Sequence, residues 1–413
     1  MLKVESNFRK FLLLWAGELI SSIGGGLTSF GLGVYIFNMT GSAAQMALVT
    51  LLGFLPPLIL GVPAGVLADR YDRRLLMMIG DGLSAVGIIY ILICMIRGQA
   101  TLLQICVGIS VSAVFSALLE PSYKATVTDL LTKEEFSKAN GLVSLAGSAR
   151  YLFSPIIAGL LLGISDVRLL LIIDICTFFV TVICAAVVRK GIPTNESDEA
   201  APFIDSLREG WKIITKNQGV LFLVIVTAFV TLFMGMFQIL AEPFILSFAD
   251  ARTLGIAETI CACGMLFTAL VLGIRGIRRG YALLLGSSLA LAGAFMVGFG
   301  IIQNMIPVCV FGFLFFATLP VANNCLDYLI RTRIPSDAQG RAWGLIGLIS
   351  QSGYVVAYAL SGTAADAVGA VSGRGAGGGA SVVIKAAGVM MILIAAGMVV
   401  GRRRFDQGEQ YGT

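Results

Sequence analysis

Residues 61–74 read Gly-Val-Pro-Ala-Gly-Val-Leu-Ala-Asp-Arg-Tyr-Asp-Arg-Arg, an apolar stretch that ends in a cluster of acidic and basic residues. It closes an apolar run over 43–67, and a second apolar run follows over 75–97. Each run exceeds the ~20 residues that a helix needs to cross a lipid bilayer. Residues 61–74 therefore predict a short charged turn that joins two transmembrane helices on one side of a membrane.

The composition extends this interpretation to the whole chain of 413 residues. Hydrophobic residues make up 57% and charged residues 13%, against about 25% charged residues in a soluble domain. Because backbone groups in lipid must be satisfied within a helix or a closed barrel, we predict an all-α membrane protein with twelve spans. Besides the two runs above, the expected spans are 11–36, 101–125, 139–163, 168–188, 218–248, 254–274, 280–302, 306–330, 341–366 and 380–401.

The positive charges predict the orientation of the chain. Most of its 29 Lys and Arg residues fall in one set of connecting segments, which includes both ends of the chain. By the positive-inside rule these segments face the cytoplasm, so we expect both termini there. This distribution explains the net charge of +5 without a nucleic-acid partner. The opposite segments hold only Arg97, Arg168, Arg252, Arg374 and Lys385.

A long connection divides the chain into an N-terminal six-helix bundle over 1–188, a cytoplasmic central loop over 189–217 and a C-terminal six-helix bundle over 218–413. Residues 193–200 are polar, and we expect them to be flexible. A helical stripe then predicts an interfacial helix on the membrane; the alternative is a plain linker. A glycine-rich stretch, 372–379, predicts a flexible external loop. The stripe consists of Phe203, Ile204, Leu207, Trp211 and Ile214.

The stretch 65–74 resembles the signature of the major facilitator superfamily, Gly-x-Leu-Ala-Asp-Arg-x-Gly-Arg-Arg/Lys, with Asp72 in place of its second glycine. The resemblance implies two pseudo-symmetric six-helix bundles and a gating role for this loop, carried by Gly61, Gly65, Asp69, Arg70, Arg73 and Arg74. Physically, two glycines four residues apart permit close helix approach. A carboxylate at a helix end can bind the N-terminus of a neighbouring helix. The alternative is that the arginines only fix the topology.

Further stretches resemble the branch of macrolide-efflux-like and enterobactin-exporter-like transporters, among them Trp15-Ala-Gly-Glu18 and Gly53-Phe-Leu-Pro56. The resemblance implies a monomeric, non-enzymatic secondary transporter of the bacterial inner membrane, without a cofactor. It would export a small amphipathic drug such as a macrolide by alternating access, as a proton-coupled antiporter. Alternatives are an exporter of a siderophore or lipid and, more distantly, a non-transporting receptor or scramblase.

The fifth span carries what resembles a degraded antiporter motif. Pro155, Gly159 and Gly163 imply a pliable, closely packed helix there. In the fourth span, Ser112 stands near the position where many relatives carry an arginine. An arginine occurs instead in the fifth span, as Arg150, so the usual proton-coupling arrangement is altered.

Ionisable residues inside spans cost about 2.5–3.5 kcal/mol each and mark functional sites. We expect Arg150 to pair with Glu18 or Glu120, one of which would exchange the coupling proton; the alternative is a static ion pair. Asp81 and Asp327 are expected to pair with loop arginines. Since the chain has no His, a His-ligated metal or His proton relay is excluded, and we expect no metal site. The candidates for proton coupling or substrate binding are Glu18, Glu120, Arg150, Asp174, Glu242 and Asp327, of which Asp174 and Glu242 could line an exit path.

The seventh span is rich in aromatic and Met residues. They could coat a pocket for apolar drugs, or they could simply pack between helices. The residues are Phe229, Phe233, Met234, Met236 and Phe237.

Overall fold

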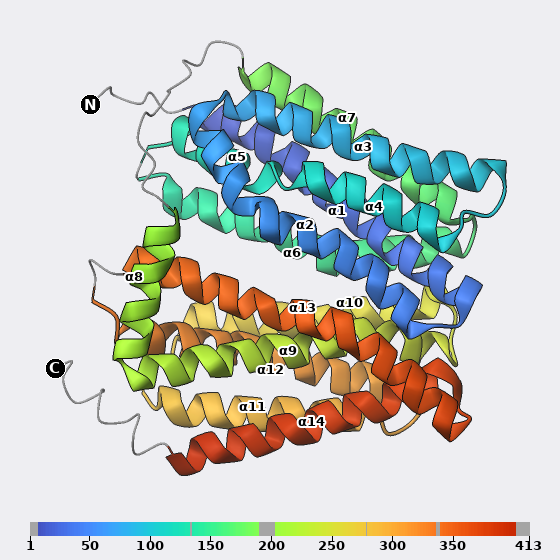
Figure 1. The fold of residues 1–413 in the computed structure, drawn as a ribbon, viewed down its shortest axis with the longest axis vertical. Coiled ribbons are helices and arrows are strands. Elements are labelled where there is room, and N and C mark those ends of the chain that lie inside the picture. The colour runs from blue at the N-terminus through green and yellow to red at the C-terminus, as the bar shows by residue number, and fades with distance from the viewer. Residues whose placement is uncertain (1–6, 133, 190–202, 278, 336–338, 402–413) are drawn as a thin grey trace. The chain divides into compact units, whose positions relative to one another are not determined.

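The computed structural model describes residues 7–132, 134–189, 203–277, 279–335 and 339–401 (Figure 1). Every regular element in these residues is an α-helix. Twelve helical stretches among them are long and apolar enough to cross a membrane, so the all-α, twelve-span expectation is confirmed. The polar residues 193–200 and the basic residues Arg402, Arg403 and Arg404 lie outside the described part of the chain.

The chain forms two compact units. Unit 1 comprises Met1–Thr40 and Leu48–Ala200. Within it, α1 packs against α6 and α7, while α3 packs against α4, α5 and α7. The helices of unit 1 are α1 (Phe8–Thr40), α2 (Ala43–Arg70) from Leu48 onward, α3 (Arg73–Arg97), α4 (Leu102–Ser116), α5 (Leu119–Leu130), α6 (Phe136–Leu162) and α7 (Val167–Arg189).

Unit 2 comprises Gly41–Ala47 and Ala201–Thr413. Within it, α12 packs against α10 and α11, α9 packs against α13, and α14 packs against α11 and α13, as Figure 1 illustrates. The helices of unit 2 are α8 (Phe203–Lys216), α9 (Gln218–Leu246), α10 (Ala251–Arg275), α11 (Tyr281–Phe299), α12 (Met305–Arg331), α13 (Gln339–Ser372) and α14 (Gly375–Gly401).

The fourth span is broken where the sequence predicted one continuous helix. It consists of α4 and α5, with a turn at Ala117 and Leu118. Pro121 follows directly, and its ring nitrogen cannot donate to the carbonyl of Ala117 four residues earlier. The break therefore has a local cause, and it turns α5 into a separate segment that carries Glu120 and Asp129.

The glycine-rich stretch 372–379 is helical, so the expectation of a flexible loop is wrong. α13 ends at Ser372 and α14 already begins at Gly375, leaving only two residues between them. The glycines are needed because the helices touch. A Cβ added at Gly379 would overlap the carbonyl of Ala365, and one at Gly377 would overlap the side chain of Ser247. Close packing, rather than flexibility, explains this run.

The amphipathic stripe after the central segment forms a helix, α8, as expected. α8 packs against α13, with Ile214 fully buried and Trp211 51% exposed. A buried isoleucine and a half-exposed tryptophan three residues before it, on the same face of the helix, suit a helix at a membrane surface. Its placement on the membrane stays a prediction.

The first turn of α2 belongs to unit 2 because a carboxylate of α13 holds it. Asp366 accepts hydrogen bonds from the Ser42 hydroxyl at 2.5 Å and from the backbone N–H groups of Ala43 and Ala44 at 2.9 and 3.0 Å. These N–H groups lie in the first turn of a helix and have no acceptor within it. Asp366 thus supplies an N-terminal cap from a distant part of the sequence.

Candidate functional site

Two arginines of the 61–74 stretch converge on one carboxylate, that of Asp129. Arg73 donates a hydrogen bond to Oδ1 of Asp129 at 2.6 Å, and Arg74 donates to Oδ2 at 2.9 Å. The Arg74 side chain is only 2% exposed, and a buried guanidinium is stable only beside an anion. Asp129 is not among the predicted site residues, although it is an acid at the end of a span that ends near the 61–74 loop.

The residue that departs from the family signature, Asp72, caps α3. Its Oδ1 accepts hydrogen bonds from the backbone N–H of Arg74 and of Leu75, and its Oδ2 pairs with Arg189 at 2.5 Å. Burial raises the pKa of Asp72, but the bonds from Arg189, Arg74 and Leu75 outweigh it and lower the pKa overall. Asp72 thus ties the start of α3 to the end of α7. We call Asp72, Arg73, Arg74, Asp129 and Arg189 the loop cluster.

The remaining residues of the expected gating motif are less constrained. Asp69 is 48% exposed and lies 3.8 Å from Arg73, and Arg70 is exposed. A Cβ added at Gly61 or Gly65 would meet nothing within 4 Å. The close helix approach expected at these two glycines and the gating role of the motif both stay predictions.

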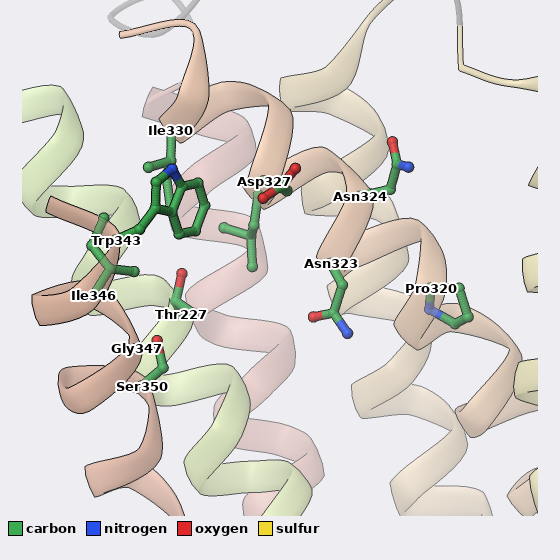
Figure 2. Close-up of a pocket in the computed structure, with 11 residues that line it drawn as sticks. Thr227, Pro320, Asn323, Asn324, Asp327, Ile330, Trp343, Ile346, Gly347 and Ser350 are labelled. Carbon is green, nitrogen blue, oxygen red and sulfur yellow. The ribbon is translucent and has the colours of Figure 1, made fainter. Parts of the chain in front are cut away.

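A pocket of about 490 Å³ opens between α9, α12 and α13 of unit 2 (Figure 2). Trp343 on α13 approaches Asp327 and Ile330 on α12, while Thr227 comes from α9. The indole N–H of Trp343 is buried and has no hydrogen-bond partner among the described residues, and such a group costs free energy unless a ligand or water satisfies it. The amides of Asn323 and Asn324 add further donors and acceptors.

Asp327, at the centre of the pocket wall, pairs with Arg331 at 3.3 Å, so its expected pairing with a basic residue is confirmed. Arg331 also lies 5.5 Å from the centre of the Trp343 ring. Asp327 and Arg331 are 50% and 57% exposed, and an exposed pair of this kind contributes little to stability. A cationic ligand could therefore replace Arg331 at Asp327 at small cost.

Three carboxylates occupy the interior of unit 1: Glu18 on α1, Asp81 on α3 and Asp174 on α7. Asp81 is 2% exposed and Asp174 is 1% exposed. Asp81 interacts electrostatically with both of the others. We call these three residues the interior acids. The expectation that Asp81 pairs with a loop arginine is wrong, because α3 turns it inward, about 12 Å along the helix from Arg73.

The expected partners of Arg150 are also wrong. Glu120 pairs with Lys124 at 2.6 Å, and both side chains are largely exposed. Arg150, itself exposed, lies against Gly26 of α1 and acts electrostatically on Asp174. Asp174 also accepts a weak hydrogen bond from the Thr177 hydroxyl.

In unit 2, Glu242 on α9 lies beside Glu258 on α10, and the two carboxyls interact electrostatically. One oxygen of Glu242 is buried and has no hydrogen-bond partner in the part of the chain that the structure describes. Glu242 is among the predicted site residues, but Glu258, which lies only about 10 Å along α10 from its start, is not. An exit path at Glu242 stays a prediction.

Two packing expectations can be checked directly. In α6, Pro155 and Gly159 are buried, and Gly163 caps the end of the helix. In α9, Phe233 and Phe237 are almost fully buried. The Phe237 ring packs against Phe299, Phe315 and Phe316. Most of the aromatic stripe of α9 therefore packs between helices.

The fold and these sites place the chain among known membrane transporters. The family model of the Major Facilitator Superfamily matches residues 14–358. The chain belongs to this superfamily of secondary transporters, and it is a transporter rather than an enzyme. A solved bacterial homolog of the human lysosomal transporter Spinster superposes with a TM-score of 0.73 at 16% identity, over 97% of this chain and 98% of that one.

Two curated relatives are exporters. Macrolide efflux protein A of Streptococcus pyogenes is 26% identical over 375 residues, which are 87% of this chain and 90% of the relative. The enterobactin exporter EntS of Escherichia coli is 25% identical over 419 residues, which are 98% of this chain and 95% of the relative. This protein is thus a multi-pass membrane protein with bacterial homologues.

Proposed function

We propose that this chain exports a small amphipathic molecule, such as a macrolide, across the bacterial inner membrane by alternating access, driven by protons. The observation that carries the proposal is its similarity, over nearly its whole length, to relatives named for two different exported compounds. Export is the property that these two names share. The distribution of basic residues further supports cytoplasmic termini, and a monomer is the simplest assembly for a chain with two six-helix halves.

The pocket at Asp327 is the candidate contact for the cargo. Its volume of about 490 Å³ lies within the ~300–1,000 Å³ typical of sites for drug-sized ligands. Trp343 and Ile346 offer apolar surface, while Asp327 offers a negative charge to an amine. Many macrolides combine a large apolar ring with an amino sugar, and this chemistry matches the lining.

Drug susceptibility tests the proposal. The chain is expressed in a bacterial strain that lacks its own macrolide pumps, and the inhibitory concentration of erythromycin is measured. We expect it to rise several-fold for the wild type and to fall back at least threefold for Asp327→Asn. Asp166→Asn, at an exposed pair outside the pocket, serves as the matched control. If expression of the wild type raises the inhibitory concentration of no macrolide, a macrolide cargo is rejected.

The similarity to the enterobactin exporter favours a second cargo class, a siderophore made by the cell itself. This alternative predicts unchanged drug susceptibility and a lower siderophore concentration in the medium of a deletion strain grown without iron. Measuring secreted catecholate in that medium separates the two cargoes. If the first assay shows no change in drug susceptibility and the second shows no change in secreted siderophore, export itself is contradicted.

A further inference from the structure

Asp81 has surroundings that an ionised carboxylate does not tolerate. It is 2% exposed, and its Oδ1 has no hydrogen-bond partner among the described residues. The charged and titratable groups that face it are the acids Glu18 from α1 and Asp174 from α7, with Tyr123 of α5 next to Glu18. α4, which also packs against α3, has no charged side chain. Burying an uncompensated charge costs several kcal/mol.

The neighbouring hydroxyl indicates which form of the carboxyl fits. Asp81 lies in hydrogen-bonding contact with Thr181 of α7. The Thr181 hydroxyl already donates its single proton to the carbonyl of Thr177, at 2.8 Å. While this bond to Thr177 is in place, Thr181 can only accept a hydrogen bond from Asp81, and a carboxyl group donates only when it carries a proton. The hydrogen bond between Asp81 and Thr181 can then form when the Asp81 carboxyl is protonated, but it has no proton to share when the carboxyl is ionised.

We propose that Asp81, inside unit 1, is the site that holds the coupling proton, whereas the cargo pocket belongs to unit 2. This proposal rests on the proposed proton-driven export and names the residue that binds the coupling proton. Glu18 is the neighbour through which the proton passes, since it is half-buried and interacts electrostatically with both Asp81 and the exposed Glu120. The proton passes from Glu18 to Asp81, and the Asp81 carboxylate accepts it as Glu18 releases it.

Infrared difference spectroscopy tests the site without any cargo. The C=O stretching band of protonated carboxylic acids is recorded at pH 7 for the purified full chain in nanodiscs. We expect Asp81→Asn to lose intensity equal to one carboxylic acid. Asp250→Asn is the control: hydrogen bonds from Thr253 lower the pKa of this helix-capping loop residue, so it contributes nothing to the band. An unchanged band in Asp81→Asn overturns the proposal.

A second variant keeps the test decisive should Asp81→Asn fold poorly. Thr181→Val has nearly the same shape and keeps the carboxyl, but removes its acceptor. We expect the band of Asp81 to shift in frequency without loss of intensity. An identical spectrum in Thr181→Val would contradict the hydrogen bond and with it the protonated form of Asp81.

Transport separates this inference from the proposed function. In inside-out vesicles, uptake of radiolabelled erythromycin is driven by a pH gradient or measured as exchange without a gradient. Asp81→Asn should lose gradient-driven uptake at least tenfold and keep exchange. If Asp81→Asn shows the same gradient-driven uptake as the wild type, Asp81 does not hold the coupling proton, but proton-driven export still stands. Uptake that requires sodium instead would refute proton coupling itself.

Discussion

The loop cluster and the interior acids both belong to unit 1, but they differ in whether each charged group has an oppositely charged partner at hydrogen-bonding distance. In the loop cluster every carboxylate has an arginine within 2.5–2.9 Å, and Arg74 is buried only because Asp129 accompanies it. Among the interior acids, Asp81 has no cation at hydrogen-bonding distance in the described part of the chain. The first arrangement is a fixed structural joint. Asp81 can be neutral only by binding a proton, and proton binding and release at such a site can drive transport.

Among the substitutions that test this difference, we expect the largest loss of stability in the loop cluster. Asp129→Asn leaves Arg74 buried without an anion, and removing one partner of a buried pair costs about 3–5 kcal/mol. We expect a large fall in melting temperature in detergent. Asp166→Asn removes half of an exposed pair and should cost less than about 1 kcal/mol. Equal melting temperatures for the two variants would show that the loop cluster is not a structural joint.

The glycines of α1 test how closely the interior acids are enclosed. A Cβ at Gly24 would overlap Thr177 and come within 2.8 Å of Oδ1 of Asp174, whereas one at Gly25 would meet nothing within 4 Å. Overpacking of this kind costs about 1–3 kcal/mol. Gly24→Ala should therefore lower the melting temperature and reduce transport, and Gly25→Ala should do neither. Tolerance of Gly24→Ala would mean that the interior is looser than described.

The smallest effect is expected at Asp72, whose partner Arg189 is 46% exposed. Asp72→Asn keeps an N-cap residue but loses the ion pair, which we expect to cost under about 1 kcal/mol. Because the folded-state pKa of Asp72 is lowered, its contribution is present above the ordinary aspartate pKa of ~3.9 and is lost as pH falls through the lower folded value. Melting temperatures of wild type and Asp72→Asn should converge toward pH 3. A constant gap would assign the effect to capping alone.

The sequence carries the number of spans and the charged turn because both depend on local composition. It does not carry the rotation of a helix about its axis, which decides what a buried charge meets. Asp81 illustrates this: its distance from the loop arginines along the chain is short, yet its side chain points away from them. The partner of Arg73 and Arg74 was missed for the same reason, since Asp129 follows a helix break. The glycine run 372–379 was misread because composition alone does not separate a flexible loop from tight helix packing.

The capping of α2 by Asp366 has a consequence for dividing the chain into fragments. A cut between residues 190 and 202 would yield two pieces of six spans each, the usual choice for testing whether halves fold alone. The C-terminal piece would then contain Asp366 but not its hydrogen-bond donors at Ser42, Ala43 and Ala44, which remain on the other piece. A C-terminal piece expressed alone therefore exposes an unmatched carboxylate, and co-expression with the N-terminal piece should raise its yield. Asp366→Ala should remove much of that dependence.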